Sequence, residues 1–241
     1  MPPDQLSALL KAAERERQTR LSRNRLAAYR PYPKQAEFHA AGKFHTERLF
    51  MAGNQLGKTI AGGMEWAMHL TGRYPDWWEG YAYNHPVRFW AAGVTGESTR
   101  DNPQRILVGP PQQKELWGTG AIPFDCLKDW DITRGLPNAI DSVIVRWGGG
   151  GDVQAQESVC AFKSYEKGRE KWQGETLDGV WYDEEPPLDI YTEGNTRVQA
   201  RNGLAIITFT PLKGMSEVVS LFLTDAMLNQ LQERAKSSVA A

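Results

Sequence analysis

The fold of this chain is decided by Ala52-Gly53-Asn54-Gln55-Leu56-Gly57-Lys58-Thr59. This stretch follows the apolar run 48–51 and precedes residues 60–70, which predict a helix. Proteins hold nucleotide phosphates with this order of elements: a strand, a tight glycine loop, Lys-Thr and a helix. The N–H groups of the loop and the positive N-terminus of the helix face the anion. Lys58 would reach the β- and γ-phosphates, and the Thr59 hydroxyl would ligate Mg²⁺. The alternative is an ordinary strand–turn–helix in which Gly-Lys-Thr occurs by chance.

One position departs from the phosphate-loop pattern G-x-x-x-x-G-K-[ST]. Ala52 stands where the pattern has its first glycine, and Gly53 follows one step later. Alanine fits at this position if its backbone keeps a negative φ. We therefore expect the whole loop, Ala52 to Thr59, to contribute to binding ATP.

A second motif supplies the acidic partner that a phosphate loop requires. The apolar run 179–182 ends in Asp183-Glu184-Glu185, followed by two prolines. Asp183 at the strand end would hold Mg²⁺, directly or through water. Glu184 would polarise the water that attacks the γ-phosphate, and Glu185 is the less favoured base. Acidic residues also mark the exit of ordinary strands into water, so the prediction of ATP hydrolysis depends on both motifs together.

An aromatic–proline cluster precedes the phosphate loop by about twenty residues. Its sequence is Tyr29-Arg30-Pro31-Tyr32-Pro33-Lys34-Gln35. The Gln35 amide can both donate to and accept from the adenine edge, and Tyr32 can stack on the ring. The alternative is a linker in which Gln35 begins the next helix.

The apolar run 204–210 ends in Thr208-Phe209-Thr210-Pro211. At the end of a strand beside the site, the hydroxyls of Thr208 and Thr210 could sense the γ-phosphate, and Pro211 and Gly214 would fix the exit turn. The alternative is a plain strand and turn.

A basic segment, residues 162–174, lies just before the Asp-Glu strand. Arg169 is its best candidate for an arginine finger, a cation that acts on a nucleotide in cis or in trans. Arg100 and Arg105 are weaker candidates. The alternative for the segment is a solvated loop or a loop that faces DNA.

Apolar runs alternate with helical or loop stretches along the rest of the chain. Further strands are expected at 87–94, 141–147 and 158–164, the last two forming a hairpin around Gly148–Asp152, and a helix at 97–108. Strands separated by helices predict an α/β fold with a mainly parallel central sheet flanked by helices.

The first thirty residues form a separate basic block. Six arginines and Lys11 stand against three acidic residues, and Leu6, Leu9 and Leu10 share one helical face. The pattern predicts a long, mostly exposed helix, residues 1–30. Its function would be an arm for DNA or a partner protein, and the alternative is a helix packed on the body through its leucines.

Composition excludes several classes of protein. With 28 basic and 29 acidic residues, the net charge of −1 does not indicate a nucleic-acid binder overall. Two cysteines, Cys126 and Cys160, suggest neither a zinc site nor a disulfide framework. No segment resembles a signal peptide or a membrane span, so we expect a cytoplasmic protein without a membrane partner.

Four motifs together resemble the large terminase subunit of tailed double-stranded DNA phages, and most of all that of short-tailed, headful-packaging phages. They are Phe50–Lys58, Arg169–Gly174, Asp183–Pro187 and Thr208–Pro211, and the resemblance runs from about Tyr29 to Leu223. It implies a P-loop ATPase of the additional-strand (ASCE) type that packages DNA.

The resemblance also implies the partners and the site. Several copies would ring the portal protein of an empty capsid in the host cytoplasm, leave before the virion matures, and cooperate with a small terminase subunit to move double-stranded DNA. Gln35 matches the adenine motif, and Thr208–Pro211 match the coupling motif. Many members carry arginines where this chain has Asn54 and Gln173, which leaves the finger role to Arg169.

The family's nuclease half would follow this chain, so we expect a motor, residues 31–223, without DNA cleavage. Residues 217–234 predict an amphipathic helix, and 224–241 would form a C-terminal helix or linker. Two other functions stay open. One is a helicase-like ATPase, which would need a second motor domain, and the other is a non-catalytic ATP-binding assembly module.

Overall fold

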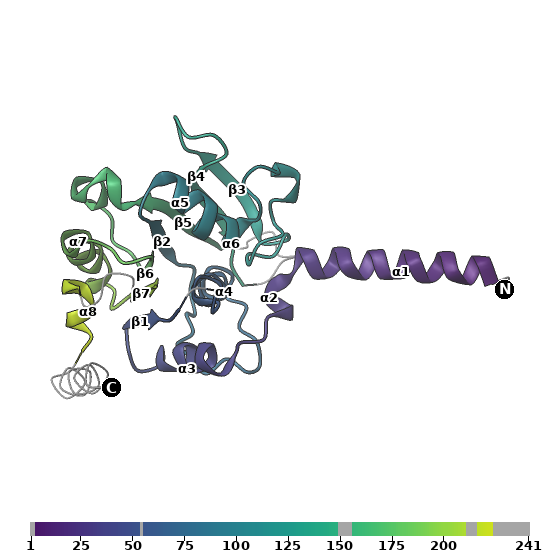
Figure 1. The fold of residues 1–241 in the computed structure, drawn as a ribbon, viewed down its shortest axis with the longest axis horizontal. Helices are drawn as coiled ribbons and strands as arrows, with labels where there is room; N and C mark the ends of the chain where they lie inside the picture. The colour runs from purple at the N-terminus through teal and green to yellow at the C-terminus, as the bar shows by residue number, and fades with distance from the viewer. Residues whose placement is uncertain (1–2, 54, 149–155, 211–215, 224–241) are drawn as a thin grey trace, which may run out of the picture.

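A seven-stranded sheet organises the described part of the chain in the computed structural model, which comprises residues 3–53, 55–148, 156–210 and 216–223 (Figure 1). The strand order is β1-β7-β6-β2-β5-β4-β3. The strands are β1 (Glu47–Met51), β2 (Arg88–Gly93), β3 (Leu127–Ile132), β4 (Ile140–Arg146), β5 (Glu157–Ser164), β6 (Gly179–Asp183) and β7 (Leu204–Phe209).

Five neighbouring strands, from β1 to β5 in the sheet order, are parallel. Strand β7 lies between β1, which leads into the phosphate loop, and β6, which ends in Asp183. This intervening strand is the additional strand of the ASCE class, so the predicted fold class is confirmed. Because parallel strands end at the same edge, the loop and the acidic turn meet there.

The other end of the sheet is antiparallel. The predicted hairpin is confirmed by the pairing of β4 with β5, while residues 149–152 of its tip lie outside the described residues. Strand β3 was not predicted from the sequence. Only Leu127 of its six residues is buried, because β3 is an edge strand, and it therefore lacks the alternation that marks a half-buried strand.

Helices cover both faces of the sheet. They are α1 (Pro3–Arg23), α2 (Arg25–Ala28), α3 (Pro33–Ala41), α4 (Lys58–Thr71), α5 (Gly96–Thr99), α6 (Arg105–Val108), α7 (Leu188–Gln199) and α8 (Glu217–Leu221), with short 3₁₀ turns at Lys114–Leu116, Tyr165–Lys167 and Arg169–Trp172. Neighbouring residues of β6 point to opposite faces, so Trp181 enters the core beneath α4 and Val180 the core beneath α7. Two separate cores therefore hold the sheet between its helical layers.

The helix expected at 97–108 is present but not regular. Between α5 and α6 the chain forms a π-helical segment, Arg100–Gln104, that contains Pro103. Proline has no N–H to donate and its ring displaces the preceding turn, which explains why the α-helical ladder is interrupted here.

The basic arm is a helix that projects from the body (Figure 1). It ends at Arg23 rather than continuing to residue 30, because the Asn24 side chain accepts from the Ala27 N–H at 3.2 Å and caps α2. Leu26 and Tyr29 are already buried in the body. Leu6, Leu9 and Leu10 remain exposed, which does not fit a helix packed through its leucines.

The expected C-terminal helix begins as predicted but ends early. Helix α8 stops at Leu221, and the ring of Phe222 lies 6.0 Å from that of Tyr191, where it packs on the body. Residues 224–234 of the predicted helix lie outside the described residues. Within the described part of the chain, no helix is both long enough and apolar enough to cross a membrane.

Candidate nucleotide-binding site

The predicted phosphate loop joins β1 to α4. Gly57 has φ of 76°, and Gln55 also has a positive φ, whereas Ala52 keeps the negative φ that alanine requires. The Lys58 ammonium is buried and donates to the Gly53 carbonyl at 2.7 Å. Asn54 lies outside the described residues. Lys58 is thus fixed in place at the N-terminus of the fourteen-residue helix α4.

Three elements converge on one oxygen of Asp183. The Thr59 hydroxyl from α4 and the Thr208 hydroxyl from β7 each donate to Asp183 Oδ1 at 3.0 Å. The indole N–H of Trp181 donates to Thr208 Oγ1 at 2.8 Å and orients that hydroxyl. Strand order explains the convergence, since β7 and β6 are neighbours whose ends lie beside α4.

The Asp183 carboxyl is almost completely buried. Burial raises its pKa to about 7, and the two threonine hydroxyls and Lys58 only partly oppose this rise. A divalent cation at its oxygens would favour the charged form and lower this pKa.

Glu184 begins the turn after β6 with a backbone in the left-handed region, φ of 69°. Its N–H donates to the Thr208 carbonyl at 2.9 Å, and the Tyr165 hydroxyl donates to the Glu184 carbonyl at 2.8 Å. A strained, non-glycine conformation held on both sides is typical of a functional position. Glu185 points elsewhere, because its carboxylate accepts from the hydroxyl of Ser216 at the start of α8.

Gln35 links the adenine motif directly to the phosphate loop. Its side-chain nitrogen donates to the Gly57 carbonyl at 2.9 Å, and its oxygen accepts from the Tyr32 N–H at 2.8 Å. A Cβ on Gly57 would lie 2.7 Å from that nitrogen, so glycine is required for this approach as well as for its φ. The Gln35 amide nitrogen carries a second N–H, and the side chain as a whole is buried. The Tyr32 ring is 71% exposed and open to stacking.

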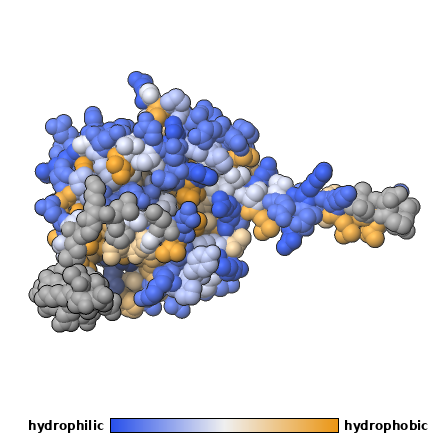
Figure 2. Space-filling view, viewed as in Figure 1, coloured by the Kyte–Doolittle hydropathy of each residue, from blue (hydrophilic) through white to orange (hydrophobic). Residues whose placement is uncertain are grey.

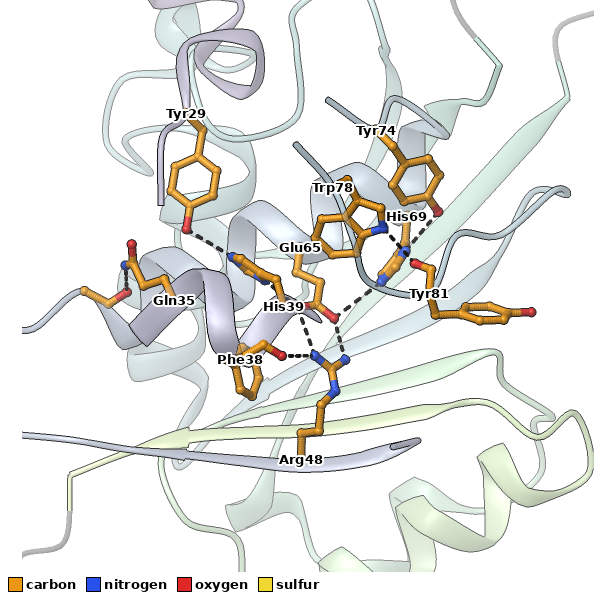
Figure 3. A network of polar contacts seen from close by, with 11 residues as sticks. Tyr29, Gln35, Phe38, His39, Arg48, Glu65, His69, Tyr74, Trp78 and Tyr81 are labelled. Carbon is orange, nitrogen blue, oxygen red and sulfur yellow. Dashed lines mark hydrogen bonds and ion pairs between the residues drawn. The ribbon is translucent and has the colours of Figure 1, made fainter. Parts of the chain in front are cut away.

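A buried ionic network holds the Gln35 helix against the loop helix (Figure 3). Arg48 of β1 binds both Glu65 of α4 and the Phe38 carbonyl of α3, and His39 Nδ1 lies 2.7 Å from a Glu65 oxygen. Burial raises the pKa of Glu65, but Arg48 and the two histidines outweigh it and hold the pKa well below its usual range. The carboxylate therefore stays charged and fixes three elements of the site relative to one another.

Arg169 lies on the far side of the sheet. Its Nε donates to Glu193 of α7 at 2.8 Å, its side chain is 59% exposed, and no described contact joins it to Lys58 or Thr59. The weaker candidates also lie elsewhere: Arg100 pairs with Asp101, and Arg105 is exposed on α6. The structure thus does not assemble a finger in cis.

The structure describes only part of the predicted coupling motif, Thr208–Pro211. Thr208 is buried and acts on Asp183, not on the surface of the site. Thr210 lies directly after β7, and residues 211–214 lie outside the described residues.

Comparison with known proteins identifies the family. Residues 49–238 match the family model described as terminase large subunit, T4likevirus-type, N-terminal. This chain belongs to the terminase large subunit family. It is 42% identical to the terminase large subunit of Salmonella phage P22 over 238 residues, 94% of the chain and 47% of that relative. It is 31% identical to that of Enterobacteria phage LP7 over 57% of the chain and 28% of the relative. It therefore spans half or less of the length of these relatives.

Solved structures of the family share the fold. The ATPase domain of the Thermus phage P74-26 large terminase superimposes with a TM-score of 0.54 and 18% identity, covering 80% of this chain and 69% of that one. A point mutant of the same domain gives a TM-score of 0.57 and 19% identity, covering 85% and 77%. At this identity the likeness shows the fold alone.

Three residues that support the candidate site were not recognised in the sequence. Tyr165 holds the backbone of Asp183 and Glu184, Trp181 orients Thr208, and Glu65 is the centre of the buried network. A glutamate within the apolar helix run 60–70 was a visible sign of a buried ionic partner. The roles of Tyr165 and Trp181 depend on contacts across strands, for which no local pattern exists.

Proposed function

We propose that this chain is the ATPase motor domain of a terminase large subunit, and that it hydrolyses ATP to drive double-stranded DNA into a procapsid. One observation carries the proposal: the hydroxyls of Thr59 and Thr208 meet at Asp183 Oδ1, each at 3.0 Å. This places the phosphate loop, the acidic strand and the coupling strand around a single oxygen.

ATP would bind along Ala52–Thr59. The loop N–H groups and the N-terminus of α4 would face the phosphates, and Lys58 would exchange the Gly53 carbonyl for phosphate oxygens. Gln35 would read the adenine edge with its remaining N–H, while Tyr32 stacks on the ring. Because Gln35 also binds Gly57, base recognition would be transmitted to the loop.

The donors at Asp183 fit Mg²⁺. A hydroxyl and a carboxylate are the hard oxygen ligands that this ion prefers, together with phosphate oxygens and water. Thr59 and Asp183 would hold the ion, which would neutralise charge on the β- and γ-phosphates. No group of three or more acidic, histidine or cysteine side chains placed to hold a metal ion occurs among the described residues, so phosphate oxygens and water would complete the coordination of the ion.

Glu184 would act as the general base. Its carboxylate would take a proton from the attacking water, and the Tyr165 hydroxyl would hold its backbone in the left-handed conformation that presents the side chain. Glu185 is less suited to the role, because it is bound to Ser216.

Arg169 would serve a neighbouring copy, since its own chain pairs it with Glu193. Residues 31–223 would form the motor, with Leu26 and Tyr29 packed into it, helix α1 would form the arm, and 224–241 a link toward a nuclease half. A ring of copies on the portal protein, with a small terminase subunit, would act transiently in the host cytoplasm.

Steady-state ATP hydrolysis with Mg²⁺ tests the proposal. Glu184→Gln should lower turnover about 10²–10⁴-fold with ATP binding unchanged, whereas the matched variant Glu185→Gln should lose far less. Equal turnover in all three proteins would refute the assignment of the base.

The finger has its own test. If Arg169 acts in trans, turnover per chain should rise with protein concentration, and Arg169→Ala should remove that rise while Lys171→Ala keeps it. A concentration-independent rate that survives Arg169→Ala would refute the role.

A further inference from the structure

An acidic groove borders the turn that carries Glu184. Two adjoining hollows of about 470 and 620 Å³ share Pro187, Leu188 and Glu217 as lining residues. Val94 and Leu188 expose 45% and 37% of their surface there, although both are apolar. The groove therefore offers apolar surface beside α7 and α8 that no described element covers.

The charge of the groove is strongly negative. Its lining carboxylates are Glu166, Glu185, Asp189 and Glu217, and its lining cation is Arg169, which is already paired with Glu193. Glu166, Asp189 and Glu217 form no ion pair with any described residue. An occupant should therefore be both apolar and basic.

The N-terminal arm has these properties. On α1, Leu6, Leu10 and Arg17 follow one another along one helical stripe, and Leu9 lies beside them. The three leucines are 46–61% exposed, and Figure 2 shows apolar side chains along one side of the arm and hydrophilic ones around them. Its 21 residues extend about 31 Å.

The arm cannot occupy the groove of its own chain. It leaves the body at one end of the long axis, and α7 and α8 lie at the other (Figure 1). Donor and acceptor surfaces at opposite ends of one molecule give head-to-tail contacts, which close into rings when the rotation allows.

We propose that the arm of one copy docks in the acidic groove of the next, leucines against Val94 and Leu188, arginines against Asp189 and Glu217. The contact would place the neighbour next to Arg169 and the Glu184 turn. It identifies the partner surface for the ring included in the proposed function.

Reversing the charges of side chains on the arm and in the groove tests this docking. Sedimentation velocity of the full chain over a concentration series, without nucleotide, should show self-association that weakens with salt. Arg17→Glu with Arg20→Glu, whose positions share the leucine side of α1, or Asp189→Lys with Glu217→Lys, should each weaken it about tenfold. Combining all four substitutions in one chain should restore it, because the charges are complementary again.

Lys43→Glu with Lys114→Glu is the matched control, since both lysines are exposed and lie outside arm and groove. Circular dichroism melts verify folding of every variant. A chain that stays monomeric at low salt, or association unchanged by either pair, overturns the docking. Sensitivity to the arm pair alone shows that the arm binds elsewhere and also overturns it. ATP hydrolysis is assayed separately, so a failure here leaves the catalytic proposal intact.

Discussion

Replacing Asp183 with asparagine is expected to remove a pH dependence from the stability of the fold. Burial raises the pKa of this carboxyl to about 7, whereas an aspartate in an unfolded chain has a pKa of about 3.9. Between these values the native state holds a proton that the unfolded state has released. The contribution to stability is therefore fully present below about pH 4 and is lost as pH rises through 7.

The size follows from the two pKa values. Each pH unit between them lowers the free energy of unfolding by about 1.4 kcal/mol, which gives about 3 kcal/mol between pH 5 and 8. Asparagine does not ionise, and its oxygen can still accept from Thr59 and Thr208. The buried amide NH₂ that replaces one carboxyl oxygen costs about 1–3 kcal/mol, equally at every pH, and leaves the slope unaffected.

Urea unfolding without Mg²⁺, followed by the fluorescence of the nine tryptophans, measures this slope at pH 5, 6, 7 and 8. The stability of the wild type should fall more than that of Asp183→Asn, and the exposed Asp141→Asn should follow the wild type. ATP with Mg²⁺ should stabilise the wild type at pH 8 and not the Asp183 variant. Parallel pH profiles for wild type and Asp183→Asn would refute the reasoning.

Three further changes probe the supports of the site. Glu65→Gln should destabilise the fold by about 3–5 kcal/mol in urea unfolding, because the Arg48 charge stays buried without its partner. An effect below about 1 kcal/mol would show that the Glu65 network does not stabilise the fold. Gly62→Ala should lower the free energy of unfolding by about 1–3 kcal/mol and lower ATP hydrolysis, since the new Cβ would lie 2.8 Å from the Trp181 ring. Unchanged turnover would show that Trp181 does not position Thr208. Gln35→Ala should weaken ATP more than GTP in equilibrium binding; equal losses would mean that Gln35 only supports the loop.

The phosphate loop was predictable because its chemistry is local. The spacing of Gly57, Lys58 and Thr59 between an apolar run and a helix fixes backbone conformation and donor direction within a few residues. The Asp183-Glu184 strand end is local too, and the two together predicted ATP hydrolysis, whereas the ASCE fold class was implied by the resemblance to terminases. The edge strand β3 was missed, because a strand with one buried residue has no hydrophobic alternation to read.

The sequence by itself thus predicted which residues would hold phosphate, metal and water. Tertiary structure alone decided how they are arranged. Thr208 meets Asp183 only because β7 lies between β1 and β6, and Arg169 faces Glu193 only because its 3₁₀ turn packs on α7. Strand order and packing bring together residues that are far apart in the chain. A pattern of neighbouring residues does not specify such long-range contacts.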